Sequence, residues 1–541
     1  MTRTLPNTQV AEIHRLMSEA AAHYNRGDIP ETGKRCLRVL KLYPDFPQAL
    51  HLLGLCQWSE GELAAAAESL ARAANLNPTE AQTYHDLGDV YSKQGRWLEA
   101  AQAYVRAIEL RPGYPDSYVN LGAVYENIGD HEQAERAYRR AFELNPQLAT
   151  AAASLAAMCE SGNHLEEAEQ WVQTALREDA DDPVANLTRA QLDMRAGRQR
   201  EAVARLETLL QKPLAPRNQS LAFARLGTVY EIFGEYDRAF KTFIAAKRVL
   251  NPGQTADSGP GFYTLETATR IAEHLETLMN PKANPAAFTD ASPVFLVGFP
   301  RSGTTLLDQI LSSHSRLSVL EEKDSLSDSL LDFVTNDAGL KRFATLDEVA
   351  LEPYRKLYWK RVAEFQPERV PGQIFVDKLP LNTIFLPLIK RLFPSARFIF
   401  AVRDPRDVVL SCFMRAFGLN EAMRNFLTLE DAARYYAAVM KIGIDSLQHL
   451  RRSMHLIRYE ALVDDVESEA RRLCTFLELE WDSGMLRFQE TARKHRINTP
   501  SYHQVVQPVY TSARERWRHY EKHLQPVLPQ LQPFVEFFGY T

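Results

Sequence analysis

The chain has 541 residues, of which 45% are hydrophobic and 24% are charged, and its formal net charge is −6. Such a length exceeds one hydrophobic core and predicts several structural units, while the composition is typical of a soluble globular protein. The slightly acidic balance argues against a protein that binds nucleic acid or an anionic membrane along much of its surface.

The N-terminal segment and the cysteines predict a cytoplasmic location. The opening sequence MTRTLPNTQVAEIHRLMSEA lacks the apolar stretch of a secretory signal, and no apolar run approaches the ~20 residues of a membrane-spanning helix. The five cysteines are scattered without metal-ligand spacing, so we expect free, buried thiols of a reducing compartment and no metal site. They are Cys36, Cys56, Cys159, Cys412 and Cys474.

The first half of the sequence repeats with a period of 34 residues. A proline recurs at this step, at Pro44, Pro78, Pro112 and Pro146. Glycines keep the same step at Gly27, Gly61, Gly95, Gly129 and Gly197, with Asn163 where a further glycine would stand. Small residues keep it in two more registers, at Gly54, Gly88 and Gly122 and at Ala66, Ala100, Ala134, Ala168 and Ala202. Such a period indicates an array of stacked structural repeats.

This pattern resembles the tetratricopeptide repeat, in about seven copies over residues 11–253. In such repeats a glycine turn ends the first helix of each pair and a proline ends the second. Each pair leaves an apolar face that its neighbour covers, so we expect an all-α superhelix. The resemblance implies a concave face that binds a protein or peptide partner, whose identity the sequence does not give.

A linker follows the repeats. Residues 251–262 (NPGQTADSGPGF) are rich in glycine, proline and polar residues, which end the helical period. Residues 263–281 predict one more helix, so that a linker and helix together occupy residues 254–290. From residue 291 to residue 541 we expect an α/β domain with a central parallel sheet.

This domain opens with a phosphate-binding turn. The apolar run at residues 293–299 predicts a buried strand, which leads through PRSGTT into an amphipathic helix. A strand, glycine turn and helix point backbone N–H groups at an anion. Gly298 and Gly303 have the spacing of a P-loop, but Thr304 replaces the lysine of nucleoside triphosphate-binding loops, which argues against an ATPase or kinase. Arg301 brings a guanidinium into the loop instead.

The sequence PRSGTTLL resembles the 5′-phosphosulfate loop of sulfotransferases, most closely that of the tyrosylprotein sulfotransferase branch. This resemblance extends over residues 291–541. It implies transfer of a sulfuryl group from 3′-phosphoadenosine-5′-phosphosulfate (PAPS), with adenosine 3′,5′-bisphosphate as the product and no metal. It assigns the 5′-phosphosulfate to the loop residues Arg301, Ser302, Gly303, Thr304 and Thr305.

A second segment, RFIFAVRDPRDVVLSCF, predicts a strand at residues 398–402, a charged turn and a helix. It resembles the element that binds the 3′-phosphate in sulfotransferases, which implies that Arg403 and Ser411 bind this phosphate with help from Arg415. An arginine fork and a hydroxyl suit a phosphate. We expect Arg406 and Asp407 to form a surface pair at the start of the helix.

Sulfuryl transfer requires a base for the acceptor and positive charge on the leaving group. Glu322 aligns with the glutamate base of the tyrosylprotein branch, and Glu321 beside it is the alternative. Lys378 ends an apolar strand and resembles the lysine that contacts the bridging oxygen of the leaving phosphate, where it would act with Arg301. We expect Asp377 to orient Lys378 or to cap the following turn.

Three further matches lie toward the C-terminus. The segment HLIRYEALV predicts a strand that includes Tyr459, which matches a nucleotide-contacting tyrosine of the family. Ser501 aligns with a serine near the sulfate, within a loop that closes over the cofactor. Arg516, before Trp517, takes the position of a basic residue that reaches the 3′-phosphate.

The acceptor stays open. Asp324 stands two residues after Glu322, where the tyrosylprotein branch has an arginine, and the two-part layout resembles bacterial proteins that join tetratricopeptide repeats to a sulfotransferase domain. The first hypothesis is a sulfotransferase whose repeats recruit a protein acceptor. The alternatives are a small-molecule, glycan or lipid sulfotransferase with repeats for assembly only, an inactive scaffold, and a nucleotide kinase. The retained charges of Arg301, Glu322, Lys378 and Arg403 favour an active enzyme.

Overall fold

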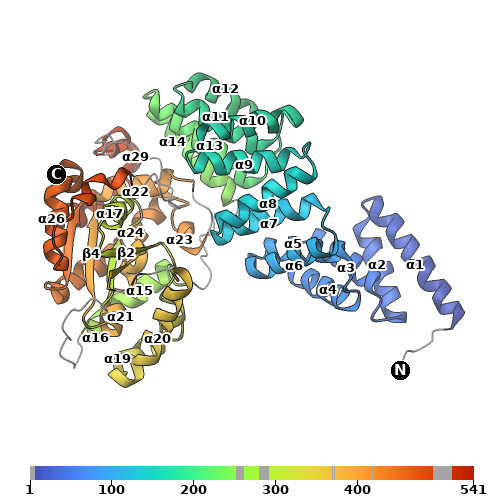
Figure 1. Ribbon diagram of the computed structural model, residues 1–541, viewed down its shortest axis with the longest axis horizontal. Helices are drawn as coiled ribbons and strands as arrows, with labels where there is room; N and C mark the ends of the chain where they lie inside the picture. Colours follow the sequence, from blue (N-terminus) through green and yellow to red (C-terminus); the bar gives the residue numbers. More distant parts are fainter. Residues whose placement is uncertain are drawn as a thin grey trace. The chain divides into compact units, whose positions relative to one another are not determined.

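The computed structural model describes residues 6–251, 261–279, 292–367, 370, 372–416, 420–490 and 514–540. The chain packs as two compact units, Met1–Glu201 and Ala202–Thr541, and each is described by itself (Figure 1). The last helical pair of the repeat region therefore packs in the same unit as the β-sheet. None of the described helices combines the length and the apolar character that crossing a membrane requires.

Helices follow one another through the repeat region and pack in successive pairs, α1 with α2 and so on, with α13 and α14 paired in the second unit. They are α1 (Asn7–Asn25), α2 (Ile29–Leu42), α3 (Pro47–Ser59), α4 (Leu63–Leu76), α5 (Ala81–Lys93), α6 (Trp97–Leu110), α7 (Pro115–Ile128), α8 (His131–Leu144), α9 (Ala149–Ser161), α10 (Leu165–Glu178), α11 (Pro183–Arg195), α12 (Gln199–Leu210), α13 (Pro216–Ile232) and α14 (Tyr236–Leu250). The predicted helical superhelix is confirmed.

The period has a direct structural cause. The turn inside each pair contains a residue with positive φ, which is glycine in most copies and Asn163 (φ 62°) in one. Asparagine tolerates this left-handed conformation better than most residues, which explains the substitution. The alanines of the third register are fully buried where the helices of a pair meet.

The glycines of the second register make room for large side chains. A Cβ atom on Gly88 would lie 2.7 Å from the ring of Tyr104, and one on Gly122 would lie 2.7 Å from the ring of Tyr138. Both rings are buried. Each glycine therefore lets a tyrosine of the second helix pack against the backbone of the first.

We expect Gly88→Val to destabilise the first unit by about 1–3 kcal/mol, because the added side chain overlaps the buried ring of Tyr104. Gly113→Ala is the matched control, since nothing lies within 4 Å of an added Cβ there. Chemical denaturation followed by circular dichroism measures both variants. Equal midpoints for the two variants would contradict this packing.

The second unit contains a five-stranded parallel sheet with the strand order β2-β3-β1-β4-β5. Its strands are β1 (Val294–Gly298), β2 (Leu317–Glu321), β3 (Ile374–Lys378), β4 (Arg397–Val402) and β5 (Met454–Arg458). The predicted parallel sheet is confirmed. Because all strands run the same way, the residues that follow them gather at one edge of the sheet, which is where open α/β sheets bind ligands.

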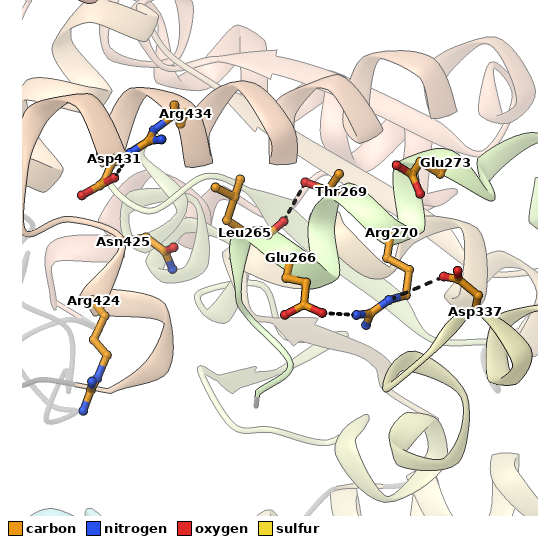
Figure 2. A pocket seen from close by; sticks show the side chains of 10 residues that line it. All are labelled: Leu265, Glu266, Thr269, Arg270, Glu273, Asp337, Arg424, Asn425, Asp431 and Arg434. Carbon is orange, nitrogen blue, oxygen red and sulfur yellow. Dashed lines mark hydrogen bonds and ion pairs between the residues drawn. The ribbon is translucent and has the colours of Figure 1, made fainter. Parts of the chain in front are cut away.

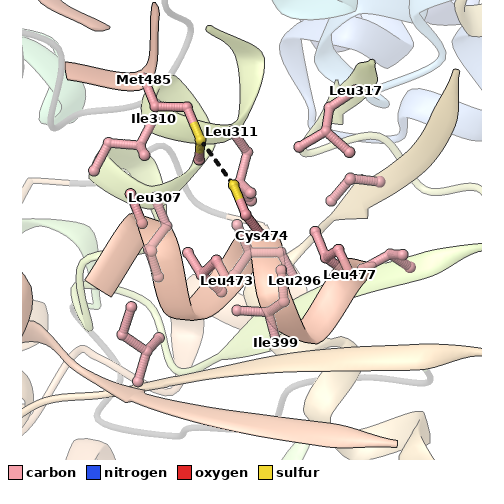
Figure 3. Close-up of a cluster of buried hydrophobic side chains, with 14 of the residues drawn as sticks. Leu296, Leu307, Ile310, Leu311, Leu317, Ile399, Leu473, Cys474, Leu477 and Met485 are labelled. Carbon is pink, nitrogen blue, oxygen red and sulfur yellow. Dashed lines mark hydrogen bonds between the residues drawn. The ribbon is translucent and has the colours of Figure 1, made fainter. Parts of the chain in front are cut away.

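Helices pack on the sheet through an apolar core (Figure 3). Leu296 of β1 and Ile399 of β4 contribute from the sheet, while Leu307 and Leu473 contribute from α17 (Thr304–Ser312) and α26 (Val466–Leu477). This burial fixes α17, the helix that follows the phosphate-binding turn, against the centre of the sheet.

The remaining helices surround this core. They are α15 (Leu265–Glu273), α16 (Leu275–Met279), α18 (Ser327–Val334), α19 (Asp337–Thr345), α20 (Glu348–Phe365), η1 (Pro380–Phe385), α21 (Leu386–Leu392), α22 (Pro405–Met414), α23 (Glu421–Arg424), α24 (Leu429–Leu450), α25 (Tyr459–Asp464), η2 (Ser483–Arg487), η3 (Arg516–Tyr520), α29 (Glu521–Leu524) and α30 (Leu528–Phe537). The single helix predicted at residues 263–281 is instead two helices, because α15 ends at His274, whose ring bonds the carbonyl of Arg270.

Two sequence predictions of finer detail have clear outcomes. The five cysteines are free and buried, as predicted. Tyr459 does not lie in a strand as predicted, because β5 ends at Arg458 and Tyr459 is the first residue of α25.

Candidate functional site

The phosphate-binding turn connects β1 to α17 and packs closely against its neighbours. A Cβ on Gly303 (φ 97°) would lie 2.6 Å from the ring of Tyr459, and one on Gly298 would lie 2.5 Å from the carbonyl of Ala401. Thr304 and Thr305 are buried in the first turn of α17, with the helix N-terminus directed at the loop. Only glycine fits either of the two tight positions.

Ser302 in this turn has an unmatched hydroxyl. Its Oγ atom is buried and makes no hydrogen bond to the described residues. A buried polar atom without a partner is rare and is expected where a ligand supplies the missing bond. The orphaned hydroxyl, the helix N-terminus and Arg301 therefore fit an anionic group such as the 5′-phosphosulfate.

Arg301 and Arg403 lie together beside the turn. Arg301 Nε donates to Ser411 Oγ at 3.1 Å, and Arg403 Nη1 donates to the carbonyl of Arg301 at 3.3 Å. The Arg403 guanidinium also lies 5.0 Å from the ring centre of Tyr459. Four predicted nucleotide-binding residues from four elements thus form one cluster, and two guanidinium groups give it the positive charge that phosphates require.

The prediction that Arg406 and Asp407 form a surface pair is wrong, because both are buried. Arg406 pairs with Asp404 at 2.7 Å and lies over the ring of Trp517 at 3.9 Å. Asp407 lies 3.6 Å from Arg403 and accepts the backbone N–H of Trp517 at 2.8 Å. Burial raises the pKa of Asp407 to about 6, against the opposing charge of Arg403. The C-terminal segment is what covers these residues.

Lys378 forms the centre of a second cluster at the same edge of the sheet. It is fully buried, and its Nζ atom lies 2.9 Å from Glu322, 3.4 Å from Glu321 and 3.6 Å from Asp308. Burial by itself lowers the pKa of Lys378, but the three carboxylates outweigh it and the pKa lies above its ordinary value. The residue is therefore a cation at neutral pH.

The two candidate bases differ in access. Glu321 ends β2 opposite Lys378 and its side chain is 19% exposed, whereas the Glu322 side chain is 37% exposed. Glu322 has a left-handed backbone (φ 44°), and its N–H donates to the carbonyl of Lys378 at 2.7 Å. Such a conformation is costly for glutamate and is enriched at functional sites.

Asp308 is a member of the cluster that the sequence analysis missed. Its Oδ1 accepts a hydrogen bond from Ser312 at 3.1 Å, while Oδ2 faces Lys378. Burial raises the pKa of Asp308 to about 7, and Lys378 opposes the rise. The signal in the sequence was an acidic residue within the apolar stretch LLDQIL, because acidic residues are rarely fully buried without a partner.

Asp377 has a different role from either one predicted. It accepts hydrogen bonds from Ser325 and from the hydroxyl of Tyr358, and burial raises its pKa to about 7. Alternation along β3 directs it to the face of the sheet opposite Lys378. It connects β3 to the helices on that face.

The remaining predicted residues are less closely joined to these clusters. Arg415 ends α22, the helix of Ser411, and its carbonyl accepts a hydrogen bond from Lys247 at 2.6 Å. Arg516 pairs with Glu231 of α13. Ser501 lies outside the described residues.

One group among the described residues could hold a metal ion, and it belongs to the repeats. Ligand atoms of His85, Asp86 and Asp89 on α5 lie within 4.8 Å of one another. Asp86 already bonds His51 at 2.6 Å, and Asp89 already accepts from the hydroxyl of Tyr104. Hydrogen bonds thus account for the group.

A separate cavity of about 620 Å³ lies among α15, α19, α23 and α24 (Figure 2). Its charges pair with one another, Arg270 with Glu266 and Asp337, and Arg434 with Asp431. None of the predicted site residues lines it.

Known proteins resemble both parts of the chain. Residues 293–483 match a family model described as "Sulfotransferase family". Models of the tetratricopeptide repeat match residues 17–81, 79–147 and 124–183.

Relatives of known sequence cover different shares of the chain. An uncharacterized protein of Aquifex aeolicus is 30% identical over 350 residues, which are 61% of this chain and 44% of that protein, so the chain spans under half of its length. A putative protein-tyrosine sulfotransferase of Caenorhabditis briggsae is 25% identical over 46% of this chain and 88% of that protein. Protein-tyrosine sulfotransferase 1 of Homo sapiens is 28% identical over 45% of this chain and 68% of that protein.

Solved structures match the helical part. The crystal structure of MamA is 28% identical and covers 30% of this chain and 94% of its own, with a TM-score of 0.29. A tetratricopeptide repeat protein from Parabacteroides merdae is 18% identical over 44% of this chain and 93% of its own, with a TM-score of 0.39. From the family models and the parallel sheet, we conclude that the chain joins tetratricopeptide repeats to a sulfotransferase-family domain at residues 293–483.

Proposed function

We propose that the protein is a PAPS-dependent sulfotransferase whose site lies at the carboxyl edge of the sheet. One observation carries the proposal. The glycine turn has no P-loop lysine, yet it contains the orphaned Ser302 hydroxyl and two guanidinium groups, and Lys378 with its carboxylates lies at the same edge. A cation cluster around a helix N-terminus suits a ligand that has two separate anionic groups.

The two anionic groups of PAPS have different receptors in this proposal. The 5′-phosphosulfate binds Arg301, the hydroxyls of Ser302, Thr304 and Thr305, and the N–H groups of the turn at Gly303. The 3′-phosphate binds Arg403 and Ser411, with Arg415, Arg516 and Ser501 as further contacts of the nucleotide. Tyr459 supports the arrangement, because its ring packs on both Gly303 and Arg403.

PAPS supplies an activated sulfuryl group with a good leaving group. The acceptor oxygen forms a bond to sulfur while the bond between sulfur and the bridging oxygen breaks. Glu322 accepts the proton of the acceptor hydroxyl or amine, and the bridging oxygen leaves with the bonding electrons as part of adenosine 3′,5′-bisphosphate. Lys378 and Arg301 stabilise the negative charge that develops there.

Proton transfer and charge stabilisation are linked through the ion pair of Glu322 with Lys378. Lys378 already faces three carboxylates, so its ammonium reaches the leaving oxygen only when one of them yields. Glu322 is the more exposed of the two glutamates. When it accepts the acceptor's proton it becomes neutral, which weakens its hold on Lys378 as negative charge develops on the leaving group.

The repeats supply a protein or peptide partner, and we propose that they recruit the acceptor. Asp324 favours an acceptor other than an acidic tyrosine peptide, because its carboxylate caps α18 by accepting the N–H of Ser327 at 3.1 Å. A small-molecule, glycan or lipid acceptor is thus the second candidate. The five buried thiols support a cytoplasmic location as part of the proposal.

Binding of nucleotides tests the proposal directly. We expect Arg403→Ala to weaken binding of adenosine 3′,5′-bisphosphate about 10–100-fold, as for loss of a charged hydrogen-bonding partner, and to change binding of adenosine 5′-phosphate less than about 3-fold. Isothermal titration calorimetry measures both. Arg434→Ala is the control, because that arginine pairs with Asp431 outside the site.

An equal loss for both nucleotides would remove Arg403 from the 3′-phosphate. Tight, magnesium-dependent binding of ATP by the wild type, with no binding of the bisphosphate, would overturn the proposed function altogether.

A further inference from the structure

The last helix of the repeats packs against the segment that contains Arg516. The ring of Tyr236 on α14 stacks on His519 at 4.3 Å, and the ring of Phe240 stacks on His523 at 4.2 Å. Asp237 bonds His523 at 2.7 Å. Helices α13 and α14 therefore share an interface of stacked rings and ion pairs with η3 and α29.

Arg516 lies at this interface in a two-pronged ion pair. Its Nε and Nη2 atoms both donate to the carboxylate of Glu231 near the end of α13. Both side chains are partly exposed, with 28% of Arg516 and 18% of Glu231 accessible. The carboxylate thus occupies one edge of the guanidinium and leaves the Nη1 edge outside the pair.

The backbone next to Arg516 is tied to the proposed nucleotide site. The N–H of Trp517 donates to Oδ1 of Asp407 at 2.8 Å, and Oδ2 of the same carboxylate lies 3.6 Å from Arg403. Arg403 belongs to the cluster beside the phosphate-binding turn. One carboxylate therefore joins the segment of Arg516 to the arginine proposed for the 3′-phosphate.

We propose that Glu231 is a positioning residue for the nucleotide: it holds Arg516 by the Nε–Nη2 edge so that the Nη1 edge meets the 3′-phosphate. This inference rests on the proposed function. An arginine side chain has about 2 kcal/mol of rotamer entropy, and fixing it before the ligand arrives removes part of that cost from binding. The last repeat pair, which is not part of the sequence matched to the sulfotransferase family, then contributes to cofactor affinity.

The opposite role makes the opposite prediction. If Glu231 competed with the phosphate for the same guanidinium, its removal would strengthen nucleotide binding. A positioning role requires that its removal weaken binding, and only for nucleotides with a 3′-phosphate.

The experiment compares Glu231→Gln, Glu231→Asp, Arg516→Ala and the double variant Glu231→Gln/Arg516→Ala. We expect Glu231→Gln to weaken binding of adenosine 3′,5′-bisphosphate about 3–10-fold, with adenosine 5′-phosphate unchanged and with partial recovery in Glu231→Asp. The double variant should bind like Arg516→Ala alone, because Glu231 acts through Arg516. In turnover, KM for PAPS should rise while kcat stays within about 2-fold.

Asp237→Asn is the matched control. Asp237 pairs with Lys522 and His523 across the same interface but does not touch Arg516. It should lower thermal stability about as much as Glu231→Gln, yet leave bisphosphate affinity within about 2-fold. This separates positioning from general weakening of the interface.

Three results would overturn the inference. They are unchanged or tighter bisphosphate binding by Glu231→Gln, an equal loss in Asp237→Asn, and a double variant with additive losses. If Arg516→Ala leaves affinity unchanged while Arg403→Ala lowers it, the inference fails and the proposed function stands. If the wild type does not bind the bisphosphate at all, the proposed function fails.

Discussion

Lys378→Met is expected to lower the rate of sulfuryl transfer by about 10²–10³-fold, the usual effect of losing a group that stabilises charge in the transition state. The substitution keeps the length of the side chain and removes the ammonium that faces Glu322 at 2.9 Å. The rate is measured with radiolabelled-sulfate PAPS and a lysate of the source organism, which also shows whether label enters protein, glycan or small molecules.

The same substitution should make stability depend more steeply on pH. Burial already raises the pKa of Asp308 to about 7, and loss of Lys378 raises it further. A carboxyl group with a higher pKa in the folded than in the unfolded state binds more protons when folded, so stability falls as the pH rises between the two values. We therefore expect the melting temperature of Lys378→Met to fall more between about pH 5 and about pH 8 than that of the wild type.

Lys390→Met is the control for both effects. Lys390 donates to the carbonyl of Pro394 at 2.6 Å, and burial lowers its pKa. It should leave transfer nearly unchanged and should not add a loss of stability at high pH. If Lys378→Met keeps its activity, Lys378 has no part in stabilising the leaving group.

Glu322→Gln is expected to lower transfer by about 10²-fold or more, as for the loss of a general base. The amide keeps the shape of the side chain but does not accept the acceptor's proton. Affinity for adenosine 3′,5′-bisphosphate should be nearly intact, because the proposed nucleotide contacts lie elsewhere. Titration calorimetry gives the affinity, and the labelled-sulfate assay gives the rate.

Glu321→Gln is the matched comparison, since its carboxylate also faces Lys378, at 3.4 Å. We expect a loss of less than about 10-fold from this variant, because its carboxylate is the more buried of the two. If Glu321→Gln abolishes transfer while Glu322→Gln does not, the base is Glu321.

Much of the fold could be predicted from the sequence because local causes repeat. One residue in each helical turn needs a left-handed backbone, which gives the glycines and Asn163 their common step of 34 residues. The parallel sheet was predictable because apolar runs alternate with helices. The break between α15 and α16 was not, because it depends on one side chain, His274, that bonds a carbonyl in the preceding turn.

The site was predictable where its residues follow strands. Arg301, Arg403 and Lys378 come at or after the ends of β1, β4 and β3, and parallel strands bring such residues to one edge. The roles of Arg406 and Asp407 were not predictable. Their burial depends on Trp517, 110 residues further along the chain from Asp407, and no local pattern reports such a partner.

Lys247 shows where the two halves of this protein cease to be modular. It is buried on α14, its pKa is lowered to about 8 by that burial, and its ammonium bonds the carbonyl of Arg415 on the α22 side. Phe240 of the same helix packs its ring 5.5 Å from that of Phe413. A recombination event or graft that exchanged the repeats as far as residue 251 would strip both partners from α22. Interchangeable repeats therefore end before α13, and any donor array must join the protein upstream of that helix.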